Sequence, residues 1–255
     1  MKNIFINIFK KNYFSVIFKK INKKFEKNTS IEAKKWAIAN NKQSTDSFLR
    51  SIDSSLYDEV LVEIKLIEQF AKNKLSNLSV SLGGGGHYIL LYFLIRKFKL
   101  LNIVETGVAA GWSSLAILKA LKKNGGGYLY SSDFPYFRLK DPENYIGYLA
   151  KDKTNKDSWF LDIRGDDVAL PLIIKLLDNK NIDLFHYDSD KSYSGRVNAL
   201  KIISSKINSK SIIIFDDIQN NFHFKDYVET NKKEFFVLEF EGKFIGIIGL
   251  NNFLI

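Results

Sequence analysis

The sequence predicts an α/β fold with a mostly parallel sheet of seven strands and additional helices at the N-terminal end. From about residue 100 onward, short apolar runs alternate with helical patterns, which is typical of parallel strands joined by crossover helices. The last two apolar runs are separated only by Glu241, Gly242 and Lys243, which indicates an antiparallel hairpin. Five alternating units followed by this hairpin account for the seven strands.

The N-terminal part of the chain is predicted to be helical. Thr29 and Glu32 have the spacing of a capping box, which predicts a helix from there to about residue 40. Apolar residues at helical spacing from Leu56 to Phe70 predict a second helix. The stretch 75–95 contains no Asp, Glu, Lys or Arg, but its apolar run is far shorter than the roughly 20 residues of a membrane span. We expect a glycine loop at 83–86 and a buried helix after it.

The α/β part accounts for the remaining elements. The strands are expected at about 101–105, 127–132, 158–161, 183–188, 211–216, 235–240 and 244–250. The chain therefore divides into a basic arm (1–28), a helical segment with the glycine loop (29–99) and an α/β domain (100–255).

The composition excludes several classes of function. The chain has no cysteine, so it has neither disulfides nor thiolate metal ligands, and a reducing compartment is compatible with it. Lysines interrupt every apolar run at the N-terminus, and no small-residue cleavage site follows, so we expect no signal peptide and a cytoplasmic location.

The net charge of +10 is concentrated at the N-terminus. Residues 1–27 contain eight lysines and one glutamate, which supply seven of the ten charges, so the rest of the chain is not a polycation and we expect no nucleic-acid partner. The arm interleaves these lysines with apolar residues, as a basic amphipathic helix on an anionic membrane surface does. Alternatively, it packs on its own domain or on a partner subunit of a homo-oligomer.

A glycine-containing loop follows the first predicted strand. The strand ends at Glu105, and the loop passes through Gly107 and Gly111 to a helix that begins near Ser113. Glycines allow sharp turns and close approach to a ligand, and a helix N-terminus attracts a carboxylate through free N–H groups. A nicotinamide cofactor would require a G-x-G-x-x-G pattern, which is absent here.

The loop sequence E-T-G-V-A-A-G-W-S-S resembles the first motif of class I S-adenosylmethionine-dependent methyltransferases, which have a Rossmann-like fold. The resemblance implies that the methionine part of S-adenosylmethionine is held by Glu105, Gly107, Gly111 and Ser113. It also implies that Asp133, after the second strand, binds the ribose hydroxyls, and that Asp166, after the third, lies near the adenine.

Acidic residues follow the fourth and fifth predicted strands. Because neighbouring parallel strands deliver their carboxyl ends to one crevice, we expect Asp188, Asp216 and Asp217 to converge. Three carboxylates repel one another, and a hard divalent cation such as Mg²⁺ would relieve that repulsion. The alternative is that Asp188 and Asp217 cap helices.

The patterns D-x-D-K-x-Y and D-D together resemble metal-dependent O-methyltransferases. The D-x-D-K part is similar to the caffeoyl-coenzyme A and catechol type, and the longer stretch with the paired aspartates is similar to the macrocin type. The resemblance implies that the metal ligands are Asp188, Asp216 and Asp217. It leaves two candidates for the catalytic base, Asp190 as in the macrocin type and Lys191 as in the catechol type; a lysine base would require a lowered pKa.

These observations predict methyl transfer to a hydroxyl group of a sugar or another polyhydroxylated small molecule. Two alternatives remain: a non-catalytic binding module that docks through its basic arm, and a hydroxylase in which His223 joins two carboxylates at an iron. A lone histidine among aromatic residues is more often simply packed. His87, directly after the glycine run, is either an acceptor-side residue or the start of a helix.

Overall fold

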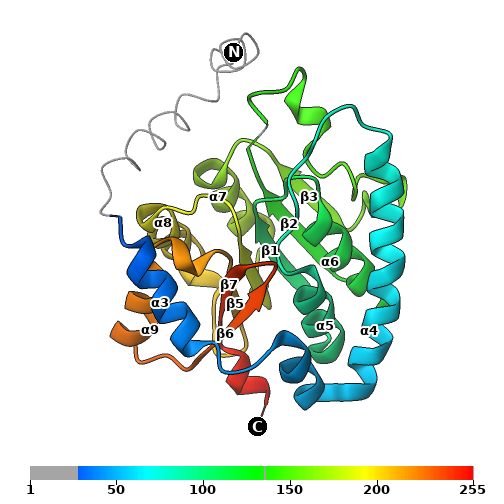
Figure 1. Cartoon of the computed structure of the whole chain (residues 1–255). Helices are drawn as coiled ribbons and strands as arrows, with labels where there is room; N and C mark the ends of the chain where they lie inside the picture. Colours follow the sequence, from blue (N-terminus) through cyan, green and yellow to red (C-terminus); the bar gives the residue numbers. More distant parts are fainter. Residues whose placement is uncertain (1–27, 135, 255) are drawn as a thin grey trace.

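The computed structural model describes residues 28–134 and 136–254, so the expected amphipathic helix of the basic arm lies outside the described residues. Elements carry the labels of Figure 1. The helices are α3 (Ser30–Asn40), α4 (Thr45–Ser76), α5 (Tyr88–Phe98), α6 (Trp112–Lys123), α7 (Asp166–Leu176), α8 (Tyr193–Ile203) and α9 (His223–Thr230). The strands are β1 (Asn102–Thr106), β2 (Tyr128–Ser132), β3 (Trp159–Asp162), β4 (Leu184–Tyr187), β5 (Ile212–Phe215), β6 (Phe235–Phe240) and β7 (Lys243–Ile248).

The strands form one seven-stranded sheet in the order β3-β2-β1-β4-β5-β7-β6. Strands β1 to β5 are mutually parallel, and β7 runs antiparallel to both of its neighbours, β5 and β6. The predicted fold class is confirmed. The last strand ends at Ile248 rather than at Leu250, because Gly249 turns the chain with a φ of +83° into a short 3₁₀ helix.

Helices cover both faces of the sheet (Figure 1). Side chains alternate between the faces along each strand, so Ile103 packs into one core and Val104 into the other. Helices α4, α5 and α6 cover the Ile103 face, and α3, α7, α8 and α9 cover the Val104 face. The Ile103 face matters most for the site, because its side chains at the strand ends belong to the acidic cluster described below.

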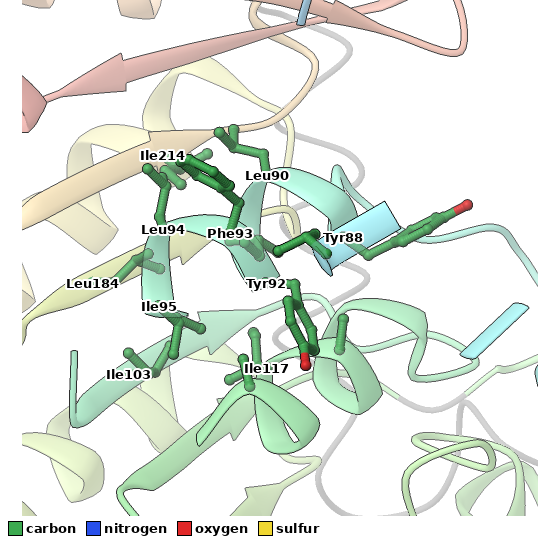
Figure 2. Close-up of a cluster of buried hydrophobic side chains, with 14 of the residues drawn as sticks. Tyr88, Leu90, Tyr92, Phe93, Leu94, Ile95, Ile103, Ile117, Leu184 and Ile214 are labelled. Atoms are coloured by element: carbon green, nitrogen blue, oxygen red, sulfur yellow. The ribbon is translucent and has the colours of Figure 1, made fainter. Parts of the chain in front are cut away.

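Helix α5 is the buried helix that the sequence predicts. Every residue from Leu90 to Ile95 is at most 1% exposed. Figure 2 shows these side chains packed against Ile103, Leu184 and Ile214 of the sheet and Ile117 of α6. Within the described part of the chain, no helix combines the length and the apolar character of a membrane span. The absence of charged residues from Tyr88 to Ile95 therefore reflects burial between the sheet and the outer helices.

The predicted capping box at the start of α3 is wrong, although the bounds of the helix are close to those expected. The Thr29 side chain makes no cap hydrogen bond; its hydroxyl instead accepts a hydrogen bond from the Phe222 N–H at 3.1 Å. This long-range contact ties the start of α3 to the segment before α9. A tertiary contact thus replaces the local cap that the sequence pattern predicts for α3. Helix α4 does have a side-chain cap, because the Ser44 hydroxyl accepts a hydrogen bond from the Ser47 N–H.

The buried position of α5 leads to a stability prediction. Leu94→Ala removes a fully buried side chain and is expected to lower the free energy of unfolding by about 2–5 kcal/mol. The matched control is Leu66→Ala in α4, where the side chain is 57% exposed and the change should stay within about 0.5 kcal/mol. Chemical denaturation of both variants measures this; equal losses would contradict the placement of α5.

Candidate active site

The carboxyl ends of β1 and β4 meet at the point where the strand order reverses. From β1 the chain proceeds to β2 and β3 on one side, and β4 and β5 lie on the other. In open α/β sheets, ligands bind in the crevice at this switch point. The loop after β1 contains the two glycines, and the loop after β4 begins at Asp188, so both motifs of the sequence border the same crevice.

Both glycines of the loop are required by neighbouring backbone. Gly107 has a φ of +83°, and a Cβ atom there would overlap the carbonyl group of Asp188. Gly111, with a φ of +95°, precedes α6, and a Cβ atom there would lie 3.0 Å from the Cα of Gly147. We expected these glycines to allow close approach to a ligand; in the structure they allow close approach to two other segments of the chain.

Asp133 holds the glycine loop in place. One oxygen of its carboxylate accepts hydrogen bonds from the N–H groups of Val108 (2.9 Å) and Ala109 (2.6 Å), and the other accepts from Phe134 (2.6 Å). Burial raises the pKa of Asp133 to about 7, although the three N–H donors favour its charged form. Asp133 therefore lies at the glycine loop, and its role toward ribose hydroxyls stays a prediction.

Glu105 lies beneath the loop and is fully buried. Its Oε2 accepts hydrogen bonds from the hydroxyls of Ser114 in α6 (2.6 Å) and Ser131 in β2 (2.9 Å). Its Oε1 lies 3.9 Å from Nδ1 of His186. These contacts join β1, β2, β4 and α6, so Glu105 holds together the elements from which the loop emerges.

The other two predicted cofactor residues are also buried. Ser113 lies in the first turn of α6. Asp166, at the start of α7, accepts hydrogen bonds from the hydroxyls of Ser132 (2.6 Å) and Ser189 and so joins the ends of β2 and β4. Their contacts with a cofactor stay predictions.

Asp188 and Asp216 converge as predicted, and they do so around a histidine that sequence reasoning missed. His186, Asp188 and Asp216 each offer one ligand atom, and these atoms all lie within 4.8 Å of one another. The Nε2 atom of His186 is 3.7 Å from Oδ2 of Asp216. A signal for it existed in the sequence, because His186 precedes Asp188 by two residues in a strand and therefore faces the same side of the sheet.

The structure does not bring Asp217 into this group. Its carboxylate accepts a hydrogen bond from the Gln219 amide at 2.9 Å and forms an ion pair with Lys191. The Lys191 ammonium also lies 2.8 Å from Oδ1 of Asp188. Asp188 and Asp217 raise the pKa of Lys191 although burial lowers it, which opposes the lowered pKa that a lysine base requires.

Asp190 lies beside the cluster, but its carboxylate is directed at α8. Oδ1 accepts a hydrogen bond from the Ser192 N–H at 3.1 Å, and Oδ2 lies where a Cβ on Gly195 would approach it to 2.6 Å. The carboxylate thus occupies the N-terminal turn of α8.

Arg196 is a second residue that the sequence analysis missed. It is fully buried in α8, and its Nη2 donates to the backbone carbonyls of Asp216 (2.8 Å) and Asp217 (2.9 Å). Arg196 thereby fixes the turn after β5 that presents Asp216. Its helical spacing with the apolar Ala199 and Ile203 places it on the buried face of α8, which was the available sequence signal.

The two other histidines have structural contacts. His87 precedes α5, accepts a hydrogen bond from the Leu90 N–H through Nδ1 at 3.4 Å and stacks on Phe240, so it starts the helix. His223 is packed against the rings of Tyr193 and Phe215 and does not join the metal-type group found among the described residues. Burial lowers the pKa of both histidines to about 3, so both are neutral.

Residues 104–218 match a family model described as "Methyltransferase domain". Ribosomal RNA large subunit methyltransferase E of Methanosphaera stadtmanae is 26% identical over 151 residues, which cover 56% of this chain and 70% of that protein.

The fold is shared with solved methyltransferases. An O-methyltransferase from Bacillus cereus, in complex with S-adenosylhomocysteine, superposes with a TM-score of 0.52 at 16% identity and covers 80% of this chain and 96% of its own. TomG of Streptomyces achromogenes, an O-methyltransferase in complex with S-adenosylmethionine, gives 0.52 at 12% identity, covering 71% and 88%. Residues 104–218 are thus similar to a methyltransferase domain, and these solved structures share the fold of this chain.

The contacts of Asp133 lead to a prediction about cofactor binding. Asp133→Asn places an amide NH₂ group against backbone N–H donors, so the loop loses an acceptor that it needs. We expect the variant to lose most of the rise in Tm that S-adenosylhomocysteine causes, which for the wild-type chain corresponds to about 2.7 kcal/mol at a hundredfold excess over Kd.

The matched control for this experiment is Asp183→Asn. Asp183 accepts two backbone N–H groups at 2.9 Å, those of Leu101 and Asn102, but at the opposite end of β1. Thermal melts of both variants with and without ligand separate binding from stability. A normal ligand-induced shift in folded Asp133→Asn would remove this residue from the binding site.

Proposed function

We propose that this protein is a class I S-adenosylmethionine-dependent methyltransferase and that it transfers the sulfonium methyl group to a hydroxyl group of a sugar or another polyhydroxylated small molecule, assisted by a divalent cation. The observation that carries the proposal is the direct packing of the glycine loop on the acidic cluster. Gly107 touches the backbone of Asp188, so a methyl donor on this loop lies beside the acidic residues.

The residues of the cluster fit a divalent cation. Oδ2 of Asp216 and both ring nitrogens of His186 are buried without a hydrogen-bond partner. Buried polar atoms without partners are costly, and a cation would satisfy those directed at the cluster. Asp188 and Asp216 would hold it, and the third expected ligand, Asp217, lies on the far side of Lys191. A bound cation would lower the pKa of an acceptor hydroxyl and so make it a better nucleophile.

The remaining residues would bind and orient the cofactor. Its carboxylate fits the N-terminus of α6 next to Ser113, where the first-turn N–H groups have no intrahelical partner. Asp133 would accept the ribose hydroxyls, and Asp166 would border the adenine. Glu105 keeps the loop in position through its buried serine contacts.

We assign the role of general base to Asp190, which would accept the proton of the acceptor hydroxyl. In the cation-free arrangement, the pKa of Lys191 is raised by the two carboxylates beside it although burial lowers it, which disfavours Lys191 as the base. Lys191 would instead act as a charged donor toward the acceptor. Asp190 can accept a proton once its carboxylate rotates away from the first turn of α8.

The first test is methyl transfer itself. With radiolabelled S-adenosylmethionine and a pool of sugars and polyols, we expect label in the acceptor, loss of activity with a chelator, and recovery with added cation. Asp216→Ala should reduce turnover steeply while S-adenosylhomocysteine still binds, because the cofactor lies mainly on β1 to β3.

The relative from Methanosphaera stadtmanae makes ribosomal RNA the second acceptor to include in this assay. Label in RNA alone would contradict the small-molecule acceptor. If neither the chelator nor Asp216→Ala has an effect, the cation proposal fails, and absence of any transfer would favour a non-catalytic module.

The second test separates the two candidates for the base. Asp190→Asn keeps the size of the side chain and its acceptor for the Ser192 N–H but cannot take up a proton, so kcat should fall and added Mg²⁺ should not restore it. Lys191→Met removes the ammonium group while leaving Asp190 intact. Nearly full activity of Asp190→Asn together with an inactive Lys191→Met would move the base to Lys191.

A further inference from the structure

We infer that His186 is a direct nitrogen ligand of the cation, together with Asp188 and Asp216, and that the site therefore prefers a first-row transition ion such as Mn²⁺ or Zn²⁺ to Mg²⁺. The inference rests on the cation of the proposed function. It changes the ligand set from three aspartates to one histidine and two aspartates, and with it the metal preference.

The spacing of the atoms fits ligation and does not fit a hydrogen bond. The 3.7 Å between Nε2 of His186 and Oδ2 of Asp216 exceeds the roughly 3.2 Å of an N–H···O hydrogen bond. Two ligand atoms at about 2.0–2.2 Å from one ion can lie up to about 4.4 Å apart. The whole group, within 4.8 Å, needs only a small inward movement to close on an ion. His186 is completely buried, and neither of its nitrogens has a hydrogen-bond partner.

Glu105 lies on the side of His186 that faces away from Asp216, where a carboxylate can orient a metal-binding imidazole ring. Metal-binding histidines commonly direct their other ring nitrogen at a carboxylate, which fixes the orientation of the ring. Here Nδ1 of His186 faces Oε1 of Glu105 at 3.9 Å, and the two residues are paired in register across β1 and β4. The serine contacts of Glu105 leave this oxygen without any other partner.

The glycine run before α5 leaves room for this group. A Cβ atom on Gly86 would lie 2.5 Å from Oδ2 of Asp216 and 2.9 Å from Nε2 of His186. Glycine at position 86 therefore keeps the space beside both ligand atoms free of a side chain.

Chemistry of the ligands decides the metal preference. Mg²⁺ is bound through oxygen atoms and keeps several waters, whereas imidazole nitrogen suits Zn²⁺ and other first-row transition ions. The third oxygen ligand expected for Mg²⁺, from Asp217, is engaged by Lys191 and Gln219.

Pulsed electron paramagnetic resonance of the full chain loaded with Mn²⁺ tests the inference without relying on activity. We expect a histidine nitrogen coupling to Mn²⁺, which changes from the ¹⁴N to the ¹⁵N pattern when the protein is made with ¹⁵N-histidine. The chain has three histidines, so variants assign the signal. His186→Gln should abolish the coupling, and the matched control His223→Phe should keep it, because His223 lies among aromatic rings away from the cluster.

Metal competition gives a second readout. The ratio of Mn²⁺ to Mg²⁺ affinity should fall at least about tenfold in His186→Gln, since changes even to residues behind a metal ligand cost about 10–100-fold in affinity. If His186→Gln does not fold, a histidine coupling that survives in both His87→Gln and His223→Phe assigns the nitrogen to His186, the remaining histidine.

Three results would overturn the inference. Mn²⁺ bound without a histidine coupling would make His186 a structural bridge between Glu105 and Asp216, with the proposed function intact. A coupling that survives in His186→Gln would assign the nitrogen to another histidine. No binding of Mn²⁺ at all would overturn both this inference and the cation of the proposed function.

Discussion

The contact between Gly107 and the backbone of Asp188 is the constraint on which the site depends. It exists because β1 and β4 are neighbours in the sheet, although more than 70 residues of chain separate their sequences. Any side chain at position 107 would push the two loops apart. One backbone contact therefore sets the distance between the glycine loop, where we propose that the methyl donor binds, and the acidic cluster.

Burying charged side chains in this arrangement costs free energy, and neighbouring groups of opposite charge or hydrogen-bonding groups offset that cost. Glu105 and Asp216 lie on either side of His186 on one face of the sheet, and Lys191 lies between Asp188 and Asp217. Arg196 adds a buried guanidinium group at the turn after β5. Removing one partner from such a network leaves an uncompensated charge, so single substitutions here affect stability as well as chemistry.

The sequence predicted the sheet, the glycine loop and the convergence of Asp188 with Asp216, because all three follow from strand periodicity and from the rule that parallel strands end at one edge. The sequence analysis did not identify His186 as a member of the cluster, because this residue lies within the apolar strand β4, where a side chain is expected to be part of the core. The separation of Asp217 from Asp216 depends on the left-handed backbone at Asp217, with a φ of 52°, which no spacing rule reveals. The Thr29 cap failed for a related reason, since its partner Phe222 is distant in sequence.

The burial of the cluster indicates the direction from which an acceptor approaches. The side chains of His186 and Asp216 are 1% and 2% exposed, whereas those of Asp188 and Lys191 are 14% and 25% exposed. Gly86 closes the buried side, and it is held there because His87 next to it begins the buried helix α5. A hydroxyl of the proposed acceptor would therefore reach the cluster from the side of Asp188 and Lys191, next to the glycine loop. On that path the proposed acceptor would meet the Lys191 ammonium before the more buried His186 and Asp216, so we propose that Lys191 orients the hydroxyl.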